Sequence, residues 1–113
     1  MITLWHNPRC SKSRETLALV HTAGADVTIR QYLEDAPTEA EIRTALKALD
    51  LPAIDMTRTG EKLFKELGLS KASSADDLIA AMAAHPILIE RPIAFAGSRA
   101  VIGRPPEAVK TLL

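Results

Sequence analysis

The only cysteine of the chain, Cys10, lies in a polar segment, Pro8–Arg14, that carries three cations and two serines. A cysteine is nucleophilic only as the thiolate, and nearby cations or a helix N-terminus lower its pKa. A structural cysteine would be expected among apolar neighbours instead. We therefore interpret Cys10 as a reactive thiol. Its thiolate would be assisted by nearby cations and hydroxyl groups, which are those of His6, Arg9, Ser11, Lys12, Ser13 and Arg14.

A chain with one cysteine cannot form an internal disulfide, so it has no disulfide framework and no dithiol cycle of its own. If Cys10 does redox chemistry, the second sulfur must come from another molecule. The cations Arg9, Lys12 and Arg14 also fit a solvated surface, and the sequence leaves both interpretations open.

The elements around Cys10 can be predicted from local patterns. The β-favouring run Ile2–Trp5 predicts a strand that ends at His6–Pro8, because proline restricts both itself and the residue before it. Apolar spacing predicts a helix from Ser11 to Ala23, and Val27–Tyr32 predicts a second strand. This order is typical of a parallel βαβ unit. The reactive thiol is therefore expected between a strand end and a helix start.

The middle of the chain is predicted to be helical, as an insertion over residues 38–88. Thr38–Glu41 fits a capping box, which predicts a helix after Thr38. Shorter helical pieces are predicted at Ala53–Met56 and Glu61–Leu67, and another helix follows Ser74 and ends before Pro86.

The last part of the chain predicts a hairpin and a helix. Ile93–Ala96 and Arg99–Ile102 are short strands separated by Gly97–Ser98, with glycine first as a type II′ turn requires. Pro105–Leu113 predicts a helix that has proline and an acid in its first turn. The predicted architecture is one α/β domain over residues 1–113, with a βαβ unit, a helical insertion and a ββα unit.

Composition excludes several classes of protein. The 113 residues include 14 Lys and Arg against 14 Asp and Glu, so no overall field attracts nucleic acid or an acidic membrane. His21 and His85 have no cysteine or carboxylate at ligand spacing, so we expect no metal site. We see no signal peptide and no apolar run of about 20 residues. A cytoplasmic protein is expected.

Three segments together resemble the glutaredoxin-dependent arsenate reductase (ArsC) family: His6–Arg14, Leu88–Ile93 and Ile102–Glu107. They contain the patterns H-N-P-x-C-x-x-S, R-P-I and R-P-x-E in that order, and the similarity extends over nearly the whole chain. It implies a thioredoxin-like fold with a four-stranded mixed sheet. The pair Ser11–Lys12 gives the C-S-K-S form of chromosomal relatives.

The resemblance also implies a site. Cys10 would attack the arsenic, while His6 and Ser13 would help to hold the thiolate. The arsenic oxyanion would be bound by Arg58, Arg91 and Arg104, and a cis peptide before Pro92 would place this proline beside Cys10. Further residues near the site would be Asn7, Lys12 and Arg14.

The implied reaction uses no bound cofactor. Cys10 would form an adduct with arsenate, glutathione would attack the adduct, and glutaredoxin would resolve the mixed species to release arsenite. Two alternatives stay open: a glutathione-dependent protein thiol reductase, and a regulator resembling the Spx proteins, which bind RNA polymerase. Spx proteins usually carry C-x-x-C, and Ser13 stands at the place of their second cysteine.

Overall fold

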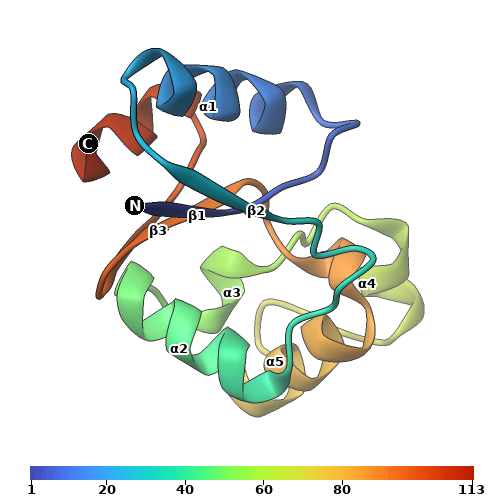
Figure 1. Ribbon diagram of the computed structural model, residues 1–113. Helices are drawn as coiled ribbons and strands as arrows, with labels where there is room; N and C mark the ends of the chain where they lie inside the picture. Colours follow the sequence, from blue (N-terminus) through green and yellow to red (C-terminus); the bar gives the residue numbers. More distant parts are fainter. The chain divides into compact units, whose positions relative to one another are not determined.

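The computed structural model describes residues 1–113 as two compact units (Figure 1). One unit combines residues 1–35 with residues 91–113, and the other comprises residues 36–90. The first unit contains every strand of the sheet, and the second contains helices α2 to α5. No helix has the length and apolar character needed to cross a membrane.

The first unit is built on a four-stranded mixed sheet with strand order β2-β1-β3-β4. Its strands are β1 (Ile2–Trp5), β2 (Val27–Arg30), β3 (Ile93–Ala96) and β4 (Arg99–Ile102). β1 is parallel to β2 and antiparallel to β3, and β3 and β4 form an antiparallel hairpin. The predicted fold class and the predicted mixed sheet are confirmed.

The hairpin turn depends on a glycine. Gly97 has a φ of +61°, whereas Ser98 is not in the positive-φ region. A positive φ at the first central residue only is the type II′ pattern, whose twist matches that of the two strands. The predicted turn residues therefore have the expected conformation.

Two helices cover one face of this sheet. α1 (Ser11–Thr22) and the C-terminal 3₁₀ helix η2 (Pro106–Leu112) pack against each other on the same side of the strands (Figure 1). The core between these layers consists of Ile2, Leu4, Val20, Ala94, Val109 and Leu112. The sequence predicted a helix at Pro105–Leu113, and the structure forms it as a slightly shorter 3₁₀ helix.

The second unit is helical: α2 (Glu39–Leu49), α3 (Ala53–Met56), α4 (Lys62–Glu66), α5 (Ala75–Ala84) and the 3₁₀ helix η1 (Pro86–Leu88). The capping box at α2 is formed, because the Glu41 backbone N–H donates to Thr38 Oγ1 at 3.1 Å and the Thr38 N–H donates to Glu41 Oε1 at 3.0 Å. Ser74 caps α5 by accepting the N–H of Asp77 at 3.1 Å. Local sequence signals therefore set the starts of both helices.

Candidate active site

Cys10 is the N-cap residue of α1 and is partly exposed. The loop that leaves β1 is closed by a turn, in which the Cys10 N–H donates to the Asn7 carbonyl at 3.0 Å. The side chain of Asn7 supports the same turn by accepting the Arg9 N–H at Oδ1, also at 3.0 Å. The predicted position of Cys10, between a strand end and a helix start, is confirmed.

The environment of Cys10 favours the thiolate. Burial raises the pKa of the thiol, but hydrogen bonds from the backbone N–H of Ser13, the Arg91 side chain and the backbone N–H of Lys12, together with the Arg91 charge, lower the pKa by more. The net result is a Cys10 pKa below its ordinary value. Free N–H groups at the start of a helix and a guanidinium ion are therefore the two aids to ionisation.

Two of the cations near Cys10 in the sequence, Lys12 and Arg14, have other partners. The Lys12 ammonium lies 3.8 Å from Glu15 Oε2, and Arg14 Nη1 donates to the Pro8 carbonyl at 3.0 Å. A role of Arg9, Lys12 and Arg14 at the thiolate stays a prediction, as does the alternative that they are solvated surface charges. The cation that lowers the pKa of Cys10 comes from the distant Arg91.

A second guanidinium also reaches the thiol. Arg104 Nη2 lies 3.8 Å from Cys10 Sγ, and Arg104 Nε donates to the Arg91 carbonyl at 2.8 Å. Arg91 comes just before β3 and Arg104 just after β4, so the antiparallel hairpin brings both to the same end of the sheet. The structure thus assembles Cys10, Arg91 and Arg104 as the family resemblance implied.

His6 and Ser13 form a buried network under the loop. Their side chains are 6% and 0% exposed, and Ser13 Oγ lies 2.6 Å from His6 Nδ1. The same oxygen accepts the Asn7 N–H at 3.0 Å. Burial, with the Arg14 charge as a smaller cause, lowers the pKa of His6 and so favours its neutral imidazole. The Ser13 hydroxyl is thus bonded to His6 and to Asn7, and the predicted role of His6 and Ser13 in holding the thiolate stays a prediction.

The backbone of Gly103 packs closely against Pro92 and Thr16, next to Arg104. The Arg91–Pro92 and Arg104–Pro105 peptides are both cis. The Gly103 N–H donates to the Pro92 carbonyl at 2.9 Å. A Cβ atom on Gly103 would lie 2.6 Å from Thr16 Oγ1 and 2.8 Å from Pro92 Cγ, distances that real Cβ atoms do not tolerate. Gly103 was not identified as a site residue from the sequence, although it lies in the Ile102–Glu107 segment.

Arg58 belongs to the other unit, residues 36–90, and is held there by carboxylates. Its Nε lies 3.0 Å from Glu61 Oε1 and its Nη1 lies 3.3 Å from Glu90 Oε1, with the side chain 23% exposed. Two ion pairs thus occupy the guanidinium that was expected to bind an oxyanion. The residues of both units include no group of three or more His, Cys, Asp or Glu side chains that could hold a metal ion.

The fold and the site define a thiol protein of the thioredoxin-like class, in which one cysteine at a helix N-terminus is flanked by guanidinium groups. The chain belongs to the ArsC family, whose model matches residues 5–112.

Its relatives include proteins with and without a named activity. The chain is 49% identical to "Uncharacterized protein in glnII region" of Streptomyces viridochromogenes, with 97% of each chain covered. It is 40% identical to an arsenate reductase of Neisseria meningitidis, over 99% of this chain and 97% of the other. Among solved structures, an arsenate reductase from Vibrio cholerae has a TM-score of 0.95 and 46% identity, covering 99% of this chain and 97% of that one.

Proposed function

We propose that this protein is an arsenate reductase in which Cys10 is the nucleophile and glutathione and glutaredoxin supply the external thiols. The observation that carries the proposal is the pair of guanidinium groups, Arg91 and Arg104, at a thiol of lowered pKa. Relatives over nearly the full length are named arsenate reductases. A thiol that only reduced neutral disulfides would not need two such groups.

In the first step the Cys10 thiolate attacks arsenic. An S–As bond forms, an As–O bond breaks, and the departing hydroxide takes a proton and leaves as water, so arsenic stays in the +5 state. Arsenate is an anion, and an anion approaching a thiolate is repelled unless positive charge lies between them. Planar guanidinium groups donate two parallel hydrogen bonds to such oxygens, which gives Arg91 and Arg104 this role.

In the second step glutathione replaces another oxygen on arsenic. Its thiolate forms a second S–As bond, and water leaves. A glutaredoxin thiolate then attacks the glutathione sulfur, so that an S–S bond forms, the As–S bond to glutathione breaks and its electron pair stays on arsenic. The arsenic is now in the +3 state on Cys10, and hydrolysis releases arsenite and the thiol. A chain with one cysteine needs both outside sulfurs.

The remaining site residues are proposed to position the reacting groups. The hydroxyl of Ser13, bonded to His6 and to the Asn7 N–H, fixes the loop so that the Ser13 backbone N–H points at the thiolate. Arg58 would act as a third ligand for the oxyanion only by exchanging the carboxylates of Glu61 and Glu90 for arsenate oxygens. Arg91 and Arg104 therefore carry most of the binding in this proposal.

The proposal is tested by oxidation of NADPH in an assay coupled through glutathione reductase, glutaredoxin and glutathione, with and without arsenate. Wild type should consume NADPH in response to arsenate, and Cys10→Ser should not. If arsenate has no effect while a glutathionylated protein is reduced, the thiol reductase is the correct function. If neither substrate is used, a regulator that binds RNA polymerase would be tested next. The proposed reaction belongs in the cytoplasm, where thiols are kept reduced.

A further inference from the structure

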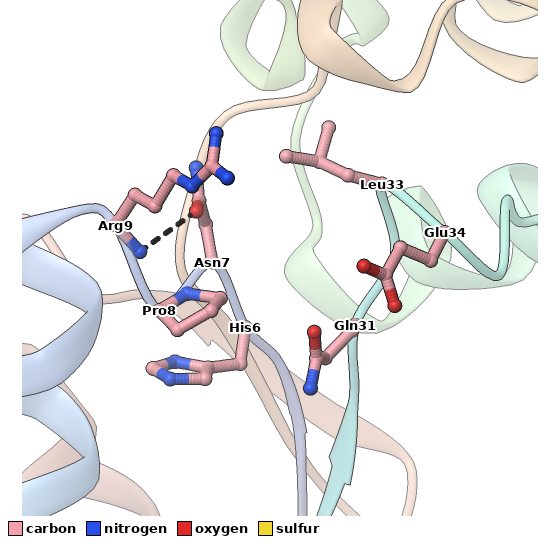
Figure 2. Close-up of a pocket in the computed structure, with 7 residues that line it drawn as sticks. All are labelled: His6, Asn7, Pro8, Arg9, Gln31, Leu33 and Glu34. Atoms are coloured by element: carbon pink, nitrogen blue, oxygen red, sulfur yellow. Dashed lines mark hydrogen bonds between the residues drawn. The ribbon is translucent and has the colours of Figure 1, made fainter.

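A pocket with a volume of about 290 Å³ lies beside the loop that precedes Cys10. One wall is formed by the loop itself, residues 6–9, and the opposite wall by Gln31, Leu33 and Glu34, which follow β2 (Figure 2). All of these residues belong to the unit that contains Cys10. The volume is near the lower limit for pockets that bind small organic molecules.

The pocket carries two opposite charges that do not pair. Arg9 lies on one wall and Glu34 on the other, and neither side chain forms an ion pair or a hydrogen bond within the chain. Nearby charged groups do have partners: Lys12 pairs with Glu15, and Arg30 with Asp35. The unpaired cation and the unpaired anion thus face one cavity from opposite sides.

The remaining lining residues add uncharged contacts. The side-chain amide of Gln31 can donate and accept hydrogen bonds, and Leu33, which is 43% exposed, provides an apolar surface. A site for arsenate alone would not include a carboxylate, because two anions repel each other. The lining instead suits a ligand that has a carboxylate at one end, an ammonium group at the other and amides between them.

We propose that this pocket binds glutathione, with the glycine carboxylate on Arg9 and the γ-glutamyl ammonium on Glu34. Gln31 bonds an amide of the peptide, and the sulfur is directed along the loop toward Cys10, which follows Arg9 directly. The inference rests on the proposed function only in taking glutathione as the external thiol. It adds the place where this thiol binds and the two residues that select it.

The test measures the dependence of turnover on glutathione concentration for Arg9→Gln and Glu34→Gln. Each variant should raise the KM for glutathione about fivefold, as expected for one exposed charge pair, and should leave the KM for arsenate unchanged. Arg99→Gln and Glu15→Gln remove an exposed charge of the same sign outside the pocket and serve as controls. They should behave like wild type.

A chemically modified glutathione tests whether the glycine carboxylate of the ligand binds at Arg9. Glutathione with an esterified glycine carboxylate should bind wild type about fivefold more weakly, and Arg9→Gln should not distinguish the ester from glutathione. Glu34→Gln should still distinguish them. If Arg9→Gln discriminates between the two thiols as wild type does, the glycine carboxylate does not bind at Arg9 and the assignment is overturned.

A second measurement does not depend on arsenate. Glutathione disulfide reacts with the Cys10 thiolate to form a Cys10–glutathione disulfide and release one glutathione thiolate, and mass spectrometry gives the rate. Arg9→Gln and Glu34→Gln should slow this reaction about fivefold relative to both controls. If they slow it while arsenate drives no turnover, the pocket is supported and the proposed function fails. If arsenate turnover is normal and both variants match wild type in both assays, the pocket fails alone.

Discussion

Replacing Gly103 by alanine tests the close packing of Gly103 against Thr16 and Pro92, which positions Arg104 at the thiol. The added Cβ would lie 2.6 Å from Thr16 Oγ1 and 2.8 Å from Pro92 Cγ. Both neighbours are buried, so neither can move away without disturbing α1 or the start of β3. Overpacking of this kind lowers the free energy of unfolding by about 1–3 kcal/mol. The same displacement should move Arg104 from Cys10 and lower kcat/KM for arsenate.

Urea denaturation of Gly103→Ala gives the change in the free energy of unfolding, and Gly60→Ala is the matched control. A Cβ added at Gly60 would meet no atom within 4 Å, and the φ of Gly60 is not positive. Alanine there should therefore be neutral or stabilise by up to about 1 kcal/mol. Gly103→Ala and Gly60→Ala could instead unfold at the same urea midpoint, with the same slope of the free energy of unfolding against urea. The space around Gly103 would then accept a Cβ atom, and the reasoning would be refuted.

Adding Thr16→Ala to Gly103→Ala tests which contact is responsible. The Thr16 hydroxyl donates to the Lys12 carbonyl at 2.8 Å within α1, so its loss alone should have a small effect. Because the double variant relieves the closest overlap, it should be less destabilised than the sum of the single variants by at least about 0.5 kcal/mol. Strict additivity would show that Thr16 does not resist the new Cβ.

Four further outcomes are expected. Cys10→Ser should abolish arsenate-dependent turnover without lowering the urea midpoint, because the thiolate is the attacking group; turnover near that of wild type would exclude the mechanism. Arg104→Lys should lower kcat/KM for arsenate about tenfold, since a point charge does not replace a bidentate guanidinium, and an unchanged value would show that Arg104 binds no oxyanion. The rate at which iodoacetamide alkylates Cys10 should rise with pH, with a midpoint below that of a free cysteine. Arg91→Gln should move this midpoint to higher pH, and an unchanged midpoint would contradict the role of Arg91. Because burial lowers the pKa of His6, the unfolded chain binds more protons than the folded chain. The free energy of unfolding should therefore fall as the pH drops below about 6.5, and this fall should be smaller in His6→Asn.

The local elements could be predicted from the amino-acid sequence alone, because their signals lie within a few residues. The capping box at Thr38–Glu41 starts α2, and Gly97 allows the positive φ of the hairpin turn. The alternation of β1, α1 and β2 likewise follows from the spacing of apolar residues and from loop residues at their ends. Neighbours in the chain also placed Cys10 between the end of β1 and the start of α1.

Which groups meet at the thiol depends on contacts between elements that are distant in the sequence. The β3–β4 hairpin brings Arg91 and Arg104 to Cys10, whereas Lys12 and Arg14, which are near Cys10 in the sequence, bond elsewhere. The separation of residues along the chain does not show which of them are in contact in the folded protein. The charge of Arg58 likewise does not show that it pairs with Glu61 and Glu90. Composition and periodicity describe one element at a time, while the pKa of a thiol depends on every charge and hydrogen-bond donor that folding places around it.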